Sequence, residues 1–374
     1  MSNYSTIHNH RSMIFDDLRN TYYTEAIKNA VSEGYVVLDL GAGLGIHGFT
    51  AARYGAQKVY MVEPASIIEI TKKLTHSNHL SGQIECIPGT IEEIELPERV
   101  DMITSVFTGN FLLTEDLLPS LFYARDKYLR PGGKLIPDRA KMEVVPVSAP
   151  EYYAEYVDIW NKPSQDLYFD PVRRFAANSL YTDSPEHRKA DFVSAPVELL
   201  DLDLMEATDA SCQSRIEVEV LQDGICHGWL GWFDMRLGDY WLSTSPKCAS
   251  THWSQVFLPL SDPLNIKKGD TLSFELIRPE FGDWSWSTGY HGKYQRNSTF
   301  FSQLVSTVDI QKKSDFFKPQ LSPKGKAAKD VLMWLDGEQS TAVIVEKLMA
   351  NHPQSFPDHR QASKFVKKII WQFV

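Results

Sequence analysis

The stretch Leu38-Asp39-Leu40-Gly41-Ala42-Gly43-Leu44-Gly45 decides the fold, because it joins an apolar run to a segment with helical spacing. Glycines at such a turn let the backbone approach a nucleotide-type ligand without Cβ clashes, and the following helix N-terminus favours polar groups of the ligand. Gly43 to Gly48 also fits the dinucleotide pattern G-x-G-x-x-G, which alone is a weak signal. Asp39 favours S-adenosylmethionine over NAD, since a carboxylate there would repel a pyrophosphate but can serve the ammonium of a methionine moiety, directly or through water.

Two later acids support the same ligand. Glu63 ends the apolar run Val59–Glu63, where a carboxylate can accept hydrogen bonds from both hydroxyls of a ribose. Gly89-Thr90-Ile91-Glu92 follows a third apolar run, so we expect Ile91 to flank an adenine and Glu92 to meet its amino group. The cofactor-binding residues predicted from the glycine loop and these acids are Asp39, Gly41, Gly43, Gly45, Glu63, Ile91 and Glu92.

Around this loop, residues 35–137 alternate short apolar runs with helix-like segments. The runs expected to form buried parallel strands are 36–38, 59–62, 84–87, 102–104 and 134–136. Helical spacing over residues 1–34 indicates N-terminal helices that cover this domain. The pattern predicts an α/β Rossmann-like domain of the class I methyltransferase type.

Beyond residue 137 the pattern changes to alternating strands, and residues 138–311 are predicted to form an antiparallel β-barrel domain. Within this domain, residues 151–184 are rich in aromatic side chains and are expected to form a projecting arm. A basic, proline-containing linker is expected over residues 312–329. Residues 330–374 have the size and helical pattern of a small winged-helix-like module.

Composition narrows the class of protein. The chain of 374 residues carries a formal net charge of −10, which argues against a nucleic-acid partner. Its four cysteines, Cys86, Cys212, Cys226 and Cys248, form no CxxC pair, so we expect no metal site, no disulfide framework and a reduced, cytoplasmic setting. We see neither a signal peptide nor an apolar stretch long enough to span a bilayer, and we expect no membrane contact.

Several motifs, taken in order, resemble the protein arginine methyltransferase family from about residue 4 to residue 310. The stretch Tyr4…His10-Arg11-Ser12-Met13-Ile14-Phe15-Asp16-Asp17-Leu18-Arg19 is similar to the family's helix that closes over the cofactor. Tyr123–Leu129 and Pro137–Ala140 resemble its boundary between Rossmann domain and barrel, and Thr251-His252-Trp253 resembles its Thr-His-Trp loop. The resemblance implies that Arg19 pairs with the cofactor carboxylate and that Met13 packs near the sulfonium. It also implies a homodimer, in which the arm of one subunit docks on the Rossmann domain of the other.

The substrate loop departs from the family pattern. In the family, two glutamates of this loop hold a guanidinium, because a carboxylate pair fixes both the planar group and its charge. Here Glu115 falls on the second glutamate, whereas Val106 occupies the first and Asn110 replaces an aromatic residue. Valine can neither accept a hydrogen bond nor balance a cation. The resemblance assigns Val106, Asn110 and Trp253 to the acceptor end and gives Glu115 a catalytic role.

His252 and Asp16 match the pair through which the family moves a proton away from the substrate. A histidine held by a carboxylate keeps one tautomer and titrates near neutral pH. We therefore take His252 and Asp16, with Glu115, as candidate catalytic residues, although a lone histidine is about as often a structural residue.

Three functions stay open. The first is methyl transfer from S-adenosylmethionine to a guanidino nitrogen, with a peptide, protein or small molecule as acceptor. The second, which Val106 supports, is methyl transfer to a non-guanidino nitrogen. The third is a catalytically lapsed relative that acts as a binding protein, against which the complete glycine loop speaks. A nicotinamide dehydrogenase is disfavoured by Asp39. The last module faintly resembles PqqD-like domains, some of which bind peptides.

Overall fold

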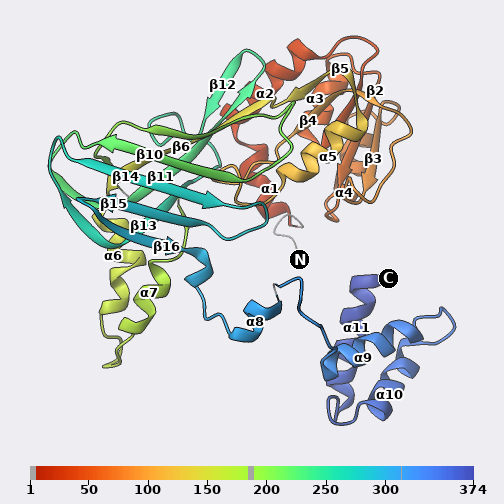
Figure 1. Cartoon of the computed structure of the whole chain (residues 1–374). Coiled ribbons are helices and arrows are strands. Elements are labelled where there is room, and N and C mark those ends of the chain that lie inside the picture. Colours follow the sequence, from red (N-terminus) through yellow and green to blue (C-terminus); the bar gives the residue numbers. More distant parts are fainter. Residues whose placement is uncertain (1–5, 184–188, 313) are drawn as a thin grey trace. The chain divides into compact units, whose positions relative to one another are not determined.

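The computed structural model describes residues 6–183, 189–312 and 314–374, and the chain forms two compact units, residues 1–304 and 305–374 (Figure 1). The larger unit contains a parallel sheet with its helices, followed by antiparallel sheets. The smaller unit is helical. No helix in the described part of the chain is long and apolar enough to cross a membrane.

The first domain of the larger unit is built on a five-stranded parallel sheet with the order β3-β2-β1-β4-β5. The strands are β1 (Val36–Leu40), β2 (Lys58–Glu63), β3 (Ile84–Pro88), β4 (Val100–Ser105) and β5 (Leu129–Ile136). Every residue of β1 is buried, as expected for an apolar strand at the centre of a sheet with helices on both faces. This confirms the predicted Rossmann-like fold.

Two helices of this domain precede β1, and the other three follow β1, β2 and β4. They are α1 (Ile7–Ile14), α2 (Asp17–Ala30), α3 (Ile46–Arg53), α4 (Ile68–Ser77) and α5 (Leu118–Tyr128). The order of the strands reverses between β1 and β4, which places a crevice beyond their carboxyl ends. Tyr4, the first residue of the N-terminal resemblance, lies outside the described residues.

Antiparallel sheets form the second domain, as predicted, and its barrel-like arrangement is seen on the left of Figure 1. One sheet has the order β10-β14-β15-β16, and the other has the order β7-β13-β11-β6-β8 with β9 and β12 alongside. The strands are β6 (Arg139–Ser148), β7 (Tyr181–Asp183), β8 (Asp191–Phe192), β9 (Val197–Asp203), β10 (Cys212–Glu219), β11 (Gly224–Leu237), β12 (Tyr240–Ser243), β13 (Gln255–Ile266), β14 (Thr271–Arg278), β15 (Ser285–Tyr290) and β16 (Lys293–Ser298).

A single hydrophobic core runs from the parallel sheet into the barrel. It joins Val37 and Met102 of the first domain to Trp229 and Phe233 of β11, all of them fully buried. The carboxyl ends of β1 and β4 are therefore held at a fixed position relative to the barrel loops, and a site between them can be preorganised.

The aromatic segment within the barrel domain, expected as a projecting arm, is largely helical. It contains α6 (Pro150–Tyr156), two short 3₁₀ turns (Asp158–Asn161 and Asp170–Val172) and α7 (Arg173–Ala176). Residue 184, the predicted end of the arm, lies outside the described residues.

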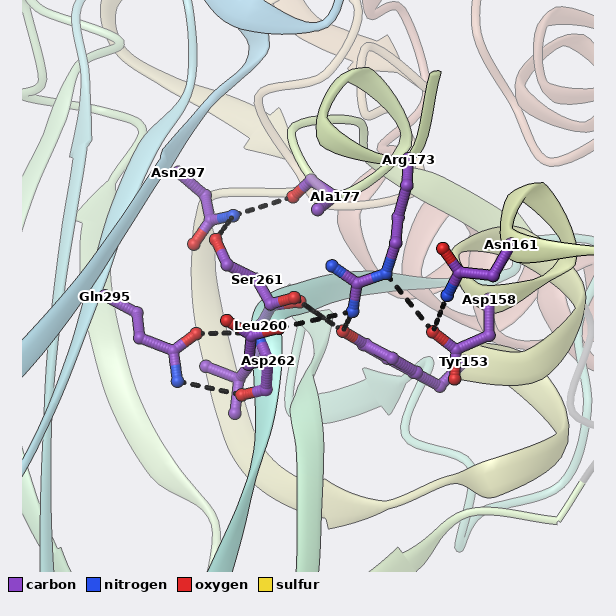
Figure 2. A network of polar contacts seen from close by, with 10 residues as sticks. All are labelled: Tyr153, Asp158, Asn161, Arg173, Ala177, Leu260, Ser261, Asp262, Gln295 and Asn297. Carbon is purple, nitrogen blue, oxygen red and sulfur yellow. Dashed lines mark hydrogen bonds and ion pairs between the residues drawn. The ribbon is translucent and has the colours of Figure 1, made fainter. Parts of the chain in front are cut away.

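Polar contacts fix this segment to the middle of β13 and to the end of β16 (Figure 2). Arg173 donates from Nη2 to the hydroxyl oxygen of Tyr153 (2.9 Å) and pairs with Asp158 and Asp262. The Tyr153 hydroxyl in turn donates to the carbonyl of Ser261 (2.8 Å), and Asn297 donates to the carbonyl of Ala177 (2.8 Å). Large apolar side chains between these anchors, including Leu167 and Tyr168, stay exposed.

The described residues of the smaller unit form the helices α8 (Thr307–Lys312), α9 (Pro323–Trp334), α10 (Thr341–Asn351) and α11 (His359–Phe373). Helix α9 begins inside the range expected to be a linker, because the Ser322 side chain caps its N-terminus and Pro323 suits the first helical position. Its Ala327 and Val331 are buried in the core of the unit. All regular structure described over residues 305–312 and 314–374 is helical, in agreement with the predicted small helical module, and a wing, which would require strands, is not among it.

Candidate functional site

A cavity of about 900 Å³ lies at the carboxyl ends of β1, β2 and β4. Helix α1 and the start of α2 form part of its wall, together with the glycine loop, the loop after β4, and residues 252–253 of the barrel. Most of the predicted site residues line it, namely Met13, Arg19, Gly41, Gly43, Glu63, Val106, Asn110, Glu115, His252 and Trp253. The predicted residues that do not line it are Asp16, Asp39, Gly45, Ile91 and Glu92.

The loop requires glycine for two reasons, which are its backbone conformation and the lack of room for a Cβ atom. Gly41, Gly43 and Gly45 all have positive φ, which strains other residues. A Cβ on Gly41 would collide with the ring of Phe107, and a Cβ on Gly43 would lie 3.0 Å from the ring of His10. Gly41 and Gly43 therefore present bare backbone to the cavity, whereas Gly45 serves as the N-cap of α3.

Glu63 ends β2 and is held by two backbone amides. Its Oε2 accepts a hydrogen bond from the Gly43 amide (3.0 Å), and its Oε1 accepts one from the Ala65 amide (2.8 Å). Each carboxylate oxygen has two lone pairs, so both can accept a second donor from the cavity. A pair of ribose hydroxyls fits this arrangement.

Asp39 stands behind the loop, where it supports the start of α3. Its Oδ2 accepts a hydrogen bond from the Gly48 amide (2.8 Å). Burial, reinforced by the nearby charge of Glu63, raises the pKa of Asp39 to about 7, although the Gly48 amide and Arg19 act in the opposite direction. A cation at the methionine end of the cavity would be attracted by this carboxylate through space.

Arg19 is a buried cation on the cavity wall. Its side chain is 3% exposed, and Nη2 donates to Nε2 of His47 at 3.1 Å. Among the described residues, its Nε is buried without a hydrogen-bond partner. Burial lowers the pKa of Arg19, although a guanidinium stays charged at neutral pH. A buried cation with an unmet donor fits a ligand carboxylate, and Met13 lines the same part of the cavity.

Ile91 and Glu92 are not part of the cavity wall. Ile91 is buried in the core, and Glu92 is exposed and accepts a hydrogen bond from the Ser120 hydroxyl (2.5 Å). The expected contacts with an adenine stay a prediction, and in this structure neither side chain is among the lining residues.

The loop after β4 carries the candidate acceptor residues and is anchored by apolar side chains. Phe111 is fully buried and stacks on Trp284 with 5.4 Å between ring centroids. Val106 and Glu115 stand on either side of this anchor, and both line the cavity. Val106 is half-buried and Glu115 is exposed, so Glu115 lies where an incoming acceptor can reach it.

Asn110 joins this loop to the Thr-His-Trp loop. Its Oδ1 accepts a hydrogen bond from the Ser254 amide (2.9 Å), while Trp253 donates from Nε1 to the carbonyl of Thr108 (3.2 Å). Asn110 also lines the cavity. Because its oxygen is engaged, we see its main contribution as holding the two loops together.

Asp116 is fixed to the barrel. Its Oδ1 accepts hydrogen bonds from the Arg278 guanidinium and from the Phe281 amide (2.9 Å). Arg278 is 1% exposed and also donates to the carbonyl of Ala210 (3.2 Å). Asp116 does not line the cavity, so it offers no second carboxylate in place of the one missing at Val106.

His252 and Asp16 form the expected pair. Asp16 is the N-cap of α2 and accepts from the Arg19 amide (2.9 Å), and its other oxygen accepts from the amide and from Nδ1 of His252 (both 2.8 Å). Burial tends to raise the pKa of Asp16, but these hydrogen bonds hold it below its ordinary value. Burial lowers the pKa of His252, although Asp16 partly opposes this shift. The imidazole is therefore a neutral base with Nε2 as its acceptor atom.

The sequence did not single out His47 as a neighbour of Arg19, or Arg278 as an anchor of the substrate loop. Local pattern carries no signal for Arg278, which lies 162 residues from Asp116. His47 falls within the glycine motif, but its contact depends on how α2 packs on α3.

The chain matches two sequence families in tandem, which together cover more than half of it. Residues 37–133 match a methyltransferase domain, and residues 138–291 match the arginine methyltransferase oligomerization subdomain. Among curated proteins, it is 35% identical over 295 residues to the histone-arginine methyltransferase CARMER of Drosophila persimilis, and equally to the probable one of Drosophila melanogaster. These alignments cover 73% of this chain and 54% of each relative, so the chain spans about half their length.

Solved structures give the same picture. A Trypanosoma brucei protein arginine methyltransferase enzyme–prozyme complex with AdoHcy is 28% identical, with a TM-score of 0.73, and the match covers 79% of this chain and 99% of that one. Protein arginine methyltransferase 10 of Arabidopsis thaliana supports the fold. It is 24% identical with a TM-score of 0.68, and the match covers 79% of this chain and 99% of that one.

Proposed function

The chain belongs to the protein arginine methyltransferase family, and we propose that it transfers the methyl group of S-adenosylmethionine to a guanidino nitrogen of a peptide or protein. One observation carries this proposal. A single cavity brings the glycine loop, Glu63 and Arg19 together with Glu115 and His252. These are the groups needed to hold the cofactor and to position a cationic acceptor beside it.

The residues of the cofactor end fit S-adenosylmethionine, whose sulfonium makes its methyl group electrophilic. Glu63 would accept from the ribose hydroxyls, and Arg19 would pair with the carboxylate through its guanidinium, whose Nε has no partner among the described residues. Bare backbone at Gly41 and Gly43 leaves room for close approach. The solved Trypanosoma brucei relative is in complex with AdoHcy, the demethylated form of this cofactor.

At the acceptor end, the chain's own residues orient a nitrogen and remove its proton. Glu115 would accept hydrogen bonds from the acceptor and balance its charge. His252, held in one tautomer by Asp16, would take the proton on Nε2. Fixing the nitrogen in line with the methyl group contributes through orientation alone.

Val106 favours a second acceptor class, a non-guanidino nitrogen such as an amine. With Asp116 held by Arg278, Glu115 is left to balance the acceptor's charge from this loop. A single carboxylate suits an amine better than a bidentate guanidinium, and Val106 would pack against its carbon atoms.

We also propose a homodimer through the exposed apolar side chains around Leu167 and Tyr168. The match of residues 138–291 to an oligomerization subdomain supports assembly. The cytoplasmic setting stays a prediction, and all four cysteines are free in the structure.

Incubation with radiolabelled S-adenosylmethionine and two matched peptides tests the function. One peptide carries a single arginine, and the other carries lysine at the same position. Label on the arginine peptide supports the first acceptor class, and label confined to lysine supports the second. Binding of S-adenosylhomocysteine without label on any peptide or cell extract would favour a lapsed relative.

A further inference from the structure

His47 and Arg19 form a buried pair at the cofactor end of the cavity. The two side chains come from α3 and α2, are 5% and 3% exposed, and both line the cavity. Nη2 of Arg19 lies 3.1 Å from Nε2 of His47. His47 occupies a variable position of the G-x-G-x-x-G pattern, so the glycine loop does not require a histidine there.

The imidazole accepts from the guanidinium. Burial, followed by the positive charge of Arg19, lowers the pKa of His47 well below its ordinary value, so the ring is neutral. Because a guanidinium has only donors, Nε2 is the acceptor atom and the ring proton is on Nδ1.

The ring is held in this orientation by Tyr23. The two rings stack with 4.3 Å between centroids and 29° between planes. Tyr23 is fully buried, and its hydroxyl donates to the carbonyl of Ser105 at the end of β4 (2.9 Å). A rigid series of contacts therefore leads from the parallel sheet through Tyr23 and His47 to Arg19.

The pair leaves Arg19 charged and partly unsatisfied. Its Nε is buried without a partner among the described residues. Asp16 and Asp39 act on Arg19 through space, and no described hydrogen bond joins either side chain to the guanidinium. An acidic side chain at position 47 would neutralise Arg19 and compete with a ligand carboxylate, whereas a neutral acceptor satisfies one donor and keeps the charge available.

We propose that His47 is a positioning residue that aims the Arg19 guanidinium at the carboxylate of the bound cofactor, and so sets affinity for the amino-acid half of that molecule. This inference rests on the proposed function, because it requires S-adenosylmethionine as the cofactor. His47 itself does not contact the reacting atoms.

Two ligands separate this role from a general effect on the fold. S-adenosylhomocysteine carries the amino-acid group, and 5′-deoxy-5′-methylthioadenosine lacks it but keeps the adenine, ribose and sulfur. Calorimetry on the full chain should show that His47→Leu weakens S-adenosylhomocysteine binding about tenfold, the scale of one hydrogen bond to a charged group. Its affinity for methylthioadenosine should match that of the wild type.

A pair of conservative variants provides the control. The Gln oxygen can reach the position of Nε2, whereas the shorter Asn side chain reaches only that of Nδ1. His47→Gln should therefore retain S-adenosylhomocysteine affinity within about threefold, and His47→Asn should lose it as His47→Leu does. If His47→Leu does not fold, the comparison of His47→Gln with His47→Asn still tests the proposal. In an Arg19→Met background, His47→Leu should have no further effect.

Equal loss of affinity for both ligands, or no loss for either, would overturn the role of His47 while leaving the cofactor assignment intact. Failure of the wild-type protein to bind S-adenosylhomocysteine would overturn both the proposed function and this inference. Weaker binding of S-adenosylhomocysteine alone supports the proposal.

Discussion

The two ends of the cavity are assembled in different ways. At the cofactor end, Gly43 and Glu63 meet across 20 residues of sequence, and Arg19 contacts His47 across 28. At the acceptor end, Asn110 meets Ser254 across 144 residues, and Asp116 meets Arg278 across 162. The cofactor end belongs largely to one βαβ unit, whereas the acceptor end exists only because the barrel packs on the parallel sheet.

Because of this difference, the two ends of the cavity differ in which of their properties can change. A βαβ unit with its glycine turn fixes where a nucleotide lies. A loop held from outside can keep its position while its chemistry changes, and here the anchors Phe111 and Asp116 persist beside a valine at the position of the missing glutamate. We infer that cofactor binding and acceptor choice can be separated by mutation.

The largest expected effect is the loss of turnover in Glu115→Gln. Removing the carboxylate that pairs with the bound cationic acceptor should lower kcat/KM about a thousandfold. The affinity for S-adenosylhomocysteine should not change. Glu63→Ala is the matched variant of the other end, and it should weaken S-adenosylhomocysteine binding about a hundredfold through loss of charged hydrogen bonds.

Methyl-transfer kinetics and calorimetry on both variants check this separation. If Glu115→Gln also lost the cofactor, or if Glu63→Ala bound it normally, the two ends would not be independent. Thermal unfolding of each variant establishes that the fold is kept.

The next effect concerns His252. Since burial lowers its pKa below 6.5, the neutral base is present above pH 6.5. At saturating cofactor, where the protonation of Asp39 no longer limits binding, wild-type kcat/KM for the acceptor should fall only at lower pH as the ring gains a proton. In His252→Gln the rate should drop about a hundredfold, the scale of general-base catalysis, and the acid limb should disappear. A pH–rate profile with an unchanged acid limb in this variant would rule out His252 as the base.

Val106→Glu reports on the acceptor class with a smaller change. If the acceptor is a guanidinium, a second carboxylate should raise its turnover about tenfold through bidentate pairing. If the acceptor is neutral or less cationic, an unpaired charge in a half-buried position should lower turnover. Val106→Gln is the control, because it adds the length of the side chain without the charge.

The outcome that contradicts this account is specific. Brisk methylation of arginine peptides by the wild type, abolished in Val106→Glu and kept in Val106→Gln, would mean that one carboxylate is sufficient and that a second disrupts the site. Glu115 would then be the carboxylate of this loop that holds the guanidinium.

How well the sequence predicts the structure also differs between elements specified by local residues and elements that depend on distant contacts. The parallel sheet and the glycine turn were confirmed because the apolar runs and glycines that specify them are local. The hydrophobic pattern also placed the antiparallel strands. It missed the helices of the arm, where aromatic residues such as Tyr152 and Tyr153 pack in a separate core under the barrel strands. It also placed the start of α9 too late, because the Ser322-Pro323 cap lies among basic, solvent-exposed residues.

Prediction of the site from the sequence has a corresponding limit. Glu63, Arg19 and His252, which the motifs singled out, all line one cavity. The roles of Asn110 and Asp116 could not be read in the same way, because each depends on a partner in the barrel that no local pattern identifies. His47 carried no signal of its own, since its neutral state results from burial beside Arg19.

The smallest expected effect is the release of a proton at the cofactor end when the ligand binds. The pKa of Asp39 is raised to about 7 by burial, so part of the free protein holds a proton there at neutral pH. The ammonium of S-adenosylhomocysteine should favour the carboxylate, and binding should release protons. Affinity should therefore rise as pH increases through 7, because less of the free protein must lose a proton first.

Calorimetry at pH 7 in buffers of different ionisation enthalpy measures this proton release, and Asp39→Asn should abolish it. Methylthioadenosine, which has no ammonium, should release none even from the wild type. Equal release with both ligands would place the titrating group at the adenine or ribose, away from Asp39.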